Sequence, residues 1–347
     1  MLPHRTVLAR RPSSSSCATT AATAAAAWVV KGAPSNVSVI QLASSSILAF
    51  THSMSKVLKF LVPAAAAAGG LYFYQTGSAS APAVLLPPVL KGDGEWVDLK
   101  LTNVKPVSND TKVYTFAFPN AEQTSGLIVA SAILTKYVTQ KGNNVIRPYT
   151  PITDVRKKGS FDLMVKTYEG GKMSVHMRGL EVGDSLPFKG PILKWKWEPN
   201  QFKEIGLIGG GTGITPLYQL VHEILSHNDV DKTKITLLYG SKTMDDILLK
   251  DELDALAAKY PDQFTVKYFI DKIVDSRKDD KITVGYIGKD VLQENLPKPS
   301  ADSHVFICGP PPLYKALSGV KVSPTDQGEV SGVLKELGYD KTDVFKF

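Results

Sequence analysis

A glycine-rich run follows an apolar segment in the second half of the chain, at residues 207–216 (LIGGGTGITP). Glycines let the backbone turn sharply and approach a pyrophosphate, and the N-terminus of a following helix favours negative charge. Pro216 stands where the usual dinucleotide fingerprint has its third glycine, and no Gly-Lys-Ser/Thr follows. The run therefore predicts a phosphate-binding turn that is neither a standard Rossmann loop nor a P-loop, with a purely structural turn as the alternative.

Three further motifs carry groups that suit a phosphate or a planar ring: residues 147–151 (RPYTP), residues 170–174 (GGKMS) and residues 308–312 (CGPPP). An arginine can neutralise a phosphate, a tyrosine can pack on a ring, and small residues with free N–H groups can cradle a pyrophosphate. Lys166 and Tyr168 lie just ahead of the second motif. Each motif is weak alone, because proline-flanked strands and Gly-Gly turns occur in many barrels.

The elements that must position these motifs change in character near residue 200. Residues 96–191 hold short alternating or β-branched runs between turns, such as KVYTFAF and FDLMVKTY, which predict a small antiparallel barrel. After about residue 201, apolar strands such as EIGLIG, ITLLYG and HVFICG alternate with helical patterns, which predicts a parallel α/β sheet. A last helix is expected from Ser323, whose Ser-Pro-Thr-Asp provides an N-cap, with Val330, Val333, Leu334 and Leu337 as its apolar face.

The formal charge of +7 belongs to the start of the chain. Residues 1–92 contain seven lysines and arginines and no acid, so residues 93–347 carry 33 residues of each sign. This body is formally neutral, which removes the main support for nucleic-acid binding. The only cysteines are Cys17 and Cys308, and the histidines are scattered, so no metal site is expected.

Residues 1–53 are rich in alanine and serine, carry arginines early and lack acids, as mitochondrial transit peptides do. A disordered extension is the alternative. Residues 54–74 include the apolar run from Val57 to Tyr74, long enough to approach the thickness of a bilayer core and predicted as a membrane anchor. A cleaved signal core or an interfacial segment remains open, and Met54 offers a second start. Residues 75–94, rich in proline, glycine and alanine, are predicted to be a linker.

In this order and over this span, the four motifs resemble those of the ferredoxin-NADP reductase superfamily, and more narrowly its NADH-cytochrome b5 reductase branch. The resemblance covers residue 95 to the end of the chain. It implies an antiparallel β-barrel FAD domain at residues 95–198 and an α/β parallel-sheet NADH domain at residues 199–347. With the leader, it also implies the fungal mitochondrial form, anchored at the outer membrane or in the intermembrane space.

The resemblance implies a site residue by residue. It assigns catalytic positions to Thr150, Lys166 and Cys308, with Cys308 packing near the hydride path rather than acting as a nucleophile. It assigns contacts with the two cofactors to Arg147, Pro148, Tyr149, Thr150, Val165, Tyr168, Gly171, Lys172, Met173, Ser174 and Thr215, and to Gly210, Gly211, Thr212, Asp246, Gly309, Pro310 and Phe347. Phe345 competes with Phe347 for the terminal aromatic position, and an ordinary buried cysteine is the alternative for Cys308.

Asp246 matches the acid that accepts hydrogen bonds from the adenosine ribose in NADH-using members. An acid there also repels a 2′-phosphate, so NADH is the expected donor. The neighbouring Ser241 and Lys242 depart from this pattern, because phosphate-binding relatives use a hydroxyl and a cation there, and this leaves tolerance of NADPH open. The tryptophan usual after the strand YFID is also missing.

The function implied is hydride transfer from NADH to FAD, followed by single-electron transfer to cytochrome b5 or a similar haem protein, by a monomer. A quinone or P450 reductase is the alternative within enzymes, and a tethered nucleotide-binding protein without turnover is the alternative outside them. Because the body is neutral, docking of an acidic cytochrome needs a local basic patch. Its predicted members are Lys157, Lys158, Lys172, Lys189, Lys194 and Lys196, with solvated surface lysines as the alternative.

Overall fold

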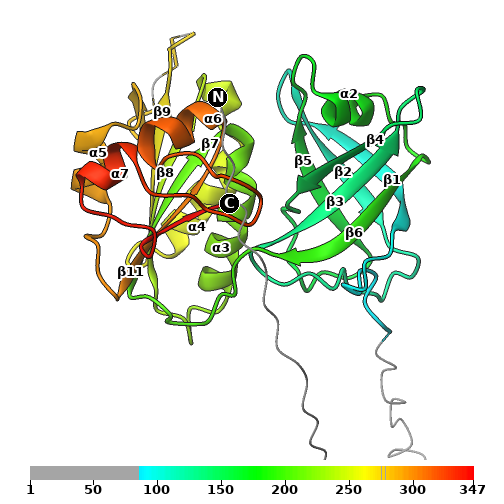
Figure 1. The fold of residues 1–347 in the computed structure, drawn as a ribbon, viewed down its shortest axis with the longest axis horizontal. Coiled ribbons are helices and arrows are strands. Elements are labelled where there is room, and N and C mark those ends of the chain that lie inside the picture. Colours follow the sequence, from blue (N-terminus) through cyan, green and yellow to red (C-terminus); the bar gives the residue numbers. More distant parts are fainter. Residues whose placement is uncertain (1–85, 275, 278) are drawn as a thin grey trace, which may run out of the picture. The chain divides into compact units, whose positions relative to one another are not determined.

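The structure is a computed structural model that describes residues 86–274, 276–277 and 279–347. The predicted leader and membrane anchor lie outside these residues. Within the described part, no helix is long and apolar enough to cross a membrane. Two lobes follow one another along the chain, an N-terminal lobe up to Leu193 and a C-terminal lobe from Glu204 (Figure 1).

The N-terminal lobe is a six-stranded antiparallel sheet with the strand order β4-β3-β6-β1-β2-β5. Its strands are β1 (Val97–Pro106), β2 (Thr111–Ala117), β3 (Ser131–Val138), β4 (Asn144–Tyr149), β5 (Ser160–Lys166) and β6 (Ser185–Leu193). Alternate residues of the strands face inward. At the centre of the sheet, the rings of Phe116, Phe161 and Phe188 pack edge to face or tilted, and the ring centroids of Phe116 and Phe188 lie 4.7 Å apart. The expected antiparallel β class of this half is confirmed.

Helix α2 (Lys172–Arg178) lies between β5 and β6. Met173 and Met177, four residues apart on one face, are buried in the core of the sheet. This burial holds the start of the helix, and with it the motif at residues 170–174, against the end of the sheet.

The end of the predicted linker packs onto the N-terminal lobe. The amides of Val89 and Leu90 donate to the carbonyls of Thr124 and Ser125, each at 3.0 Å, and Leu90 is 2% exposed. Gly126 has φ +81, and a side chain there would collide with the Leu90 carbonyl. The folded lobe therefore includes residues 87–92.

The C-terminal lobe is a six-stranded parallel sheet with the order β10-β9-β8-β7-β11-β12, which confirms the predicted parallel α/β class. Its strands are β7 (Glu204–Gly210), β8 (Lys234–Ser241), β9 (Phe264–Ile270), β10 (Ile282–Val284), β11 (Ser303–Cys308) and β12 (Val344–Lys346). Because β7 is followed along the chain by β8 on one side and flanked by β11 on the other, the order reverses between β7 and β11. Ligands of open α/β sheets bind at such a switch point.

Two apolar layers cover the sheet. Helices α3 (Ile214–Ser226) and α4 (Lys250–Lys259) contribute to the core on one face. Helices α5 (Lys289–Asn295), α6 (Pro311–Leu317) and α7 (Gly332–Glu336) contribute to the core on the other face (Figure 1). The short 3₁₀ turns η1 (Gly211–Gly213) and η2 (Met244–Asp246) follow β7 and β8. The first lies in the glycine-rich motif, and the second carries the predicted residue Asp246.

The prediction of a helix beginning at Ser323 is wrong. The Ser323 hydroxyl accepts from the amides of Thr325 and Asp326, but the turn stops there, and α7 begins only at Gly332. Gly328 and Gly332 have φ values of +62 and +66, outside the helical region. The buried ammonium of Lys346 also takes the carbonyls of Gln327 and Glu329, which a helix would use internally.

Candidate functional site

A cavity of about 1530 Å³ opens at the carboxyl ends of β7 and β11 and is also lined by β4, β5 and the start of α2. Pockets for one small ligand usually measure about 300–1,000 Å³, so this cavity has room for more than one such group. Every predicted site residue lines it. These residues are Arg147, Pro148, Tyr149, Thr150, Val165, Lys166, Tyr168, Gly171, Lys172, Met173, Ser174, Gly210, Gly211, Thr212, Thr215, Asp246, Cys308, Gly309, Pro310 and Phe347.

The wall formed by the N-terminal lobe presents a cation, an aromatic ring and free amides. Arg147 donates to the Ile146 carbonyl at 2.7 Å, and no ion pair to Arg147 is recorded among the described residues. Burial raises the pKa of the nearby Tyr149 to about 12, so its hydroxyl stays protonated. Gly171 caps α2 without a side-chain hydrogen bond, which leaves first-turn amides for an anion. This donor set fits a phosphate-bearing ring cofactor.

The glycine-rich turn meets the Cys308-Gly309-Pro310 segment at close range. A side chain at Gly213 would collide with the Cys308 carbonyl, and one at Gly210 would lie 2.9 Å from the ring of Pro310. The Tyr239 hydroxyl donates to the Gly211 carbonyl at 3.0 Å and fixes the turn from β8. Helix α3 then begins with Gly213 as its N-cap and no side-chain cap, but the Ile214 amide already donates to the carbonyls of Gly211 and Thr212, and Pro216 has no N–H. The glycine-rich turn itself is therefore the part that can approach a phosphate.

Lys166 and Asp246, both assigned to the site by the family resemblance, form an ion pair across the two lobes. The Lys166 Nζ lies 2.8 Å from Asp246 Oδ1 and 3.0 Å from Asp110 Oδ2, and the lysine side chain is 7% exposed. Burial opposes the charge on Asp246, but hydrogen bonds from Lys166 and Thr243 outweigh it and lower the pKa of the carboxyl. At Lys166, burial opposes the charge of the ammonium, but the hydrogen bonds to Asp246 and Asp110 outweigh it and raise the pKa. The sequence did not indicate Asp110.

Cys308 lies at the base of the cavity as a neutral thiol, because burial raises its pKa to about 11. Its role as a packing residue near the hydride path stays a prediction. The chain end lies beside it: the Phe347 amide donates to the Ile307 carbonyl at 3.0 Å, and the Tyr314 hydroxyl donates to the Phe347 carbonyl at 2.9 Å. Phe347 lines the cavity, whereas its competitor Phe345 packs on Trp195 with ring centroids 5.1 Å apart.

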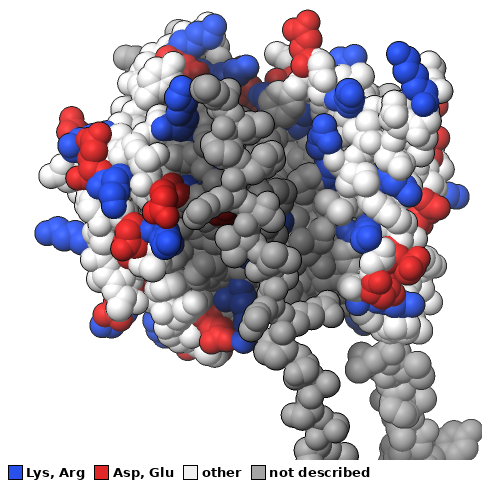
Figure 2. All heavy atoms as spheres, in the orientation of Figure 1, with Lys and Arg blue, Asp and Glu red and all other residues white. Residues whose placement is uncertain are grey.

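The six lysines of the predicted basic patch divide into two groups. Lys157, Lys158 and Lys196 form ion pairs with Asp162, Glu122 and Glu198. No ion pair is recorded in the described part of the chain for Lys172, Lys189 or Lys194, and Lys172 and Lys194 line the cavity. On the face shown in Figure 2, basic and acidic side chains are interspersed. Among the described residues, the predicted basic patch therefore has three lysines without an ion pair instead of six.

Further residues line the cavity beyond the predicted site. Ser241 ends β8 and Lys242 follows it, the hydroxyl and cation that the sequence places near Asp246, and Tyr286 follows Gly285, where the backbone has φ +136. Lys321 also lines the cavity, and burial followed by repulsion from Lys194 lowers its pKa. Ser241 and Lys242 stand out in the sequence as a hydroxyl and a cation after a parallel strand, whereas nothing in the local sequence marks Tyr286 or Lys321. Among the described residues, no group of three or more His, Cys, Asp or Glu could hold a metal ion.

Two family models match the chain, one to each lobe. The oxidoreductase FAD-binding domain matches residues 98–197, and the oxidoreductase NAD-binding domain matches residues 207–319. The lobes are therefore an FAD-binding and an NAD-binding domain. The N-terminal wall of the cavity fits FAD, because it presents the Arg147 guanidinium, which has no ion pair among the described residues, the protonated Tyr149 and the start of α2 without a side-chain cap.

Relatives and solved structures agree with these matches. The chain is 56% identical over 302 residues to NADH-cytochrome b5 reductase 2 of Scheffersomyces stipitis, covering 86% of this chain and 100% of the relative. It is 50% identical to the protein of the same name from Saccharomyces cerevisiae, covering 87% and 99%. The cytochrome b5 reductase domain of Ulva prolifera nitrate reductase superposes with a TM-score of 0.64 at 32% identity, covering 75% and 100%.

The CS-b5R domains of human Ncb5or share the fold, with a TM-score of 0.60 at 20% identity, covering 73% of this chain and 70% of that one. The alignment with the fungal proteins goes further than a common fold, because it reaches 56% identity over 86% of this chain and 100% of the relative. From these findings together, the chain belongs to the NADH-cytochrome b5 reductase family of FAD- and NAD-dependent oxidoreductases.

Proposed function

We propose that the protein takes a hydride from NADH and delivers electrons singly to cytochrome b5 or a similar haem protein. The observation that carries this proposal is the cavity of about 1530 Å³, in which the 147–151 and 170–174 motifs of the N-terminal lobe meet the glycine-rich turn and the Cys308-Gly309-Pro310 segment of the C-terminal lobe. The cavity has room for more than one ligand, as a flavin and a nicotinamide dinucleotide require. Bound FAD would supply the exchange between two-electron and one-electron chemistry.

The residues of the N-terminal lobe hold and orient the flavin in this proposal. Arg147 neutralises the flavin phosphate, because its guanidinium has no recorded carboxylate partner among the described residues. The first turn of α2, with Lys172 and Ser174, binds the pyrophosphate. Tyr149 and Thr150, with Thr215 from α3, contact the ring, and the protonated Tyr149 adds no charge beside it. The curved sheet would form the FAD-binding β-barrel, with domain boundaries at residues 95–198 and 199–347.

The residues of the C-terminal lobe receive the nicotinamide nucleotide. The turn at Gly210, Gly211 and Thr212 approaches its pyrophosphate, and Asp246, kept ionised by Lys166, accepts from the ribose. The neutral thiol of Cys308 and the ring of Phe347 exclude water near the hydride path. Lys242 lines the cavity near this acid and supports a limited tolerance of NADPH.

The setting in the cell extends the same proposal. The acid-free leader and the apolar segment at residues 54–74 support anchoring at the mitochondrial outer membrane or in the intermembrane space. A monomeric state is part of the same proposal.

The acceptor is tested by reduction of cytochrome b5 at rising salt. Charge reversal at Lys194, which lines the cavity, should raise the KM for cytochrome b5 by about two- to fivefold, because rim charges act on encounter. Lys196 is the matched control, because Glu198 already neutralises it at 2.6 Å, and its reversal should have a smaller effect. A neutral quinone measures the effect of salt on the flavin itself.

Three outcomes separate the readings. Slower cytochrome reduction at high salt, with an unchanged quinone reaction, supports the proposal. Turnover of the quinone with a cytochrome reaction that neither salt nor either reversal affects would make cytochrome b5 the wrong acceptor. Protein that binds nucleotide but oxidises no NADH would belong to the non-catalytic class.

A further inference from the structure

Helix α3 has a second face besides the apolar one that packs on its own sheet. Gln219, Glu223 and His227 follow one another at intervals of four residues, so they lie on one side of the helix, with His227 as its C-cap. We call these three residues the cross-lobe stripe. All three contact the N-terminal lobe. Gln219 bonds to the backbone of that lobe, and Glu223 and His227 bond to the guanidinium of its Arg156.

Gln219 makes the buried part of this contact. Its Oε1 accepts from the Ala130 amide at 3.1 Å, and its Nε2 donates to the Pro151 carbonyl at 3.0 Å. The side chain is 5% exposed, so each lost bond would leave a buried backbone group without a partner. Ala130 has φ +57, a left-handed conformation that residues other than glycine seldom adopt. One glutamine therefore fixes two separate segments of the N-terminal lobe.

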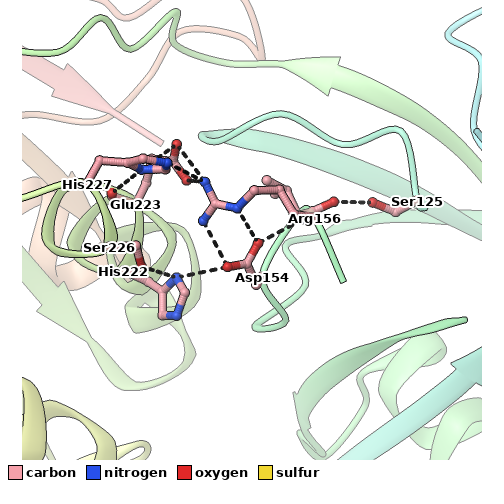
Figure 3. A network of polar contacts seen from close by, with 8 residues as sticks. Ser125, Asp154, Arg156, His222, Glu223, Ser226 and His227 are labelled. Atoms are coloured by element: carbon pink, nitrogen blue, oxygen red, sulfur yellow. Dashed lines mark hydrogen bonds and ion pairs between the residues drawn. The ribbon is translucent and has the colours of Figure 1, made fainter. Parts of the chain in front are cut away.

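Glu223 and His227 make the outer part through Arg156 (Figure 3). The Arg156 Nη1 lies 3.1 Å from Glu223 Oε2 and 3.0 Å from His227 Nε2. The arginine is itself held by Asp154, to which its Nε and Nη2 donate at 2.9 and 2.8 Å. Because a guanidinium only donates, His227 Nε2 accepts here, and its Nδ1 donates to the Glu223 carbonyl at 3.0 Å. The Arg156 side chain is 44% exposed, so this part is the weaker one.

None of these residues lines the cavity, so bound cofactors would not replace their contacts. The two segments that Gln219 joins are nevertheless adjacent in sequence to residues that line the cavity. Pro151 directly follows Thr150 in the 147–151 motif, and α3 starts directly after the glycine-rich turn. A rigid helix joins the turn at its N-terminus to the stripe at residues 219–227.

We propose that Gln219 is a positioning residue for hydride transfer, which sets the separation between the 147–151 strand end and the glycine-rich turn, with Arg156 as its outer support. The inference rests on the proposed function, since those two segments are taken to hold the flavin and the nicotinamide. A displacement of about 1 Å between reacting groups can lower a rate about a hundredfold, so loss of this contact should appear in the chemical step.

The test measures flavin reduction by NADH in the FAD-loaded full chain, by anaerobic stopped flow. Gln219→Leu should lower the limiting rate constant at least about tenfold, with flavin content and the apparent Kd for NADH within about twofold of the parent. NADH deuterated at the transferred position should give a full primary isotope effect in the variant, which shows that hydride transfer is the slowed step.

Gln263→Leu is the matched control. The Gln263 amide also bridges two carbonyls, those of Asp231 and Thr233, but both lie in the C-terminal lobe. It should lower the melting temperature as Gln219→Leu does and leave the limiting rate constant within about twofold. If Gln219→Leu does not fold, Gln219→Glu replaces it, since it keeps the acceptor for Ala130 and loses the donor to Pro151.

A folded, flavin-loaded Gln219 variant that is reduced at the parental rate overturns the inference. So does a Gln263 variant slowed to the same extent, because the effect would then follow stability alone. A parent protein that NADH does not bleach removes the proposed function instead, which keeps the two failures distinct.

Discussion

Arg147 illustrates what a single residue type can reveal before the fold is known. Its place in a proline-flanked motif predicted a phosphate partner, and within the part of the chain that the structure describes its guanidinium lines the cavity bonded only to a neighbouring carbonyl. The pairing of Lys166 with Asp246, in contrast, was not predictable, because the two side chains are 80 residues apart in sequence and come from different lobes. Motifs indicate which residues bind, whereas the partners that hold them ready come from the fold.

We predict that Arg147→Ala weakens FAD binding by about 1.5–3 kcal/mol, because it removes a charge-assisted hydrogen bond to the flavin phosphate. Titration of the flavin-free protein with FAD, followed by flavin fluorescence, gives the Kd. Arg178→Ala is the control, since Arg178 lies in the same lobe outside the cavity. Equal Kd values for parent and Arg147→Ala would remove Arg147 from the flavin site.

We predict that Lys166→Met destabilises the flavin-free protein by about 1.5–3 kcal/mol near pH 7 and by less at both pH extremes. The lowered pKa of Asp246 means that its stabilisation is present above the ordinary value of 3.8 and is lost as pH falls through the folded value. The raised pKa of Lys166 means that its stabilisation is present below 10.5 and is lost as pH rises through the folded value.

The measurement for Lys166 is urea unfolding of parent and variant from about pH 3 to pH 11. The difference in unfolding free energy should form a plateau across neutral pH. A difference that stays constant over the whole range would show that the methionine acts through packing and not through the ion pair.

At the scale of elements, the regular spacing of hydrophobic residues along the chain was the reliable signal for strands. Strands β7, β8, β9 and β11 of the parallel sheet and β1, β2, β3, β5 and β6 were predictable, because buried residues recur along each of them. The three-residue strands β10 and β12 were missed, since they are too short to show a period. Strand β4 was missed as a strand, since only Val145 is buried in it and Pro148 is tolerated at its edge position. The helix expected at Ser323 failed because two left-handed glycines and Lys346 organise that segment as a loop.

We predict that a chain beginning at Asp93 is less stable than one beginning at Leu86 by about 3–6 kcal/mol, because it loses the burial of Val89 and Leu90. Both keep every cavity residue, so both should be yellow without denaturant. Urea unfolding followed by circular dichroism measures the difference. Coincident midpoints would mean that residues 87–92 only tether the lobe.

At the scale of the whole molecule, the two lobes were predictable from the change in period near residue 200, but their docking was not. The Tyr168 hydroxyl lies 3.1 Å from the Thr212 hydroxyl, and Gln219 reaches Pro151, 68 positions earlier in the chain. Such contacts follow no local period, so sequence reasoning alone could not place them. These contacts between the lobes nonetheless hold the residues of both lobes around one cavity.

The most direct test of the account is an anaerobic titration of the purified protein with NADH, followed in the flavin absorption bands. The account predicts a yellow protein whose bands bleach with one NADH per flavin, and whose colour returns when cytochrome b5 in its oxidised form is added. A colourless protein that FAD does not restore, or a yellow one that excess NADH leaves unbleached, would contradict it.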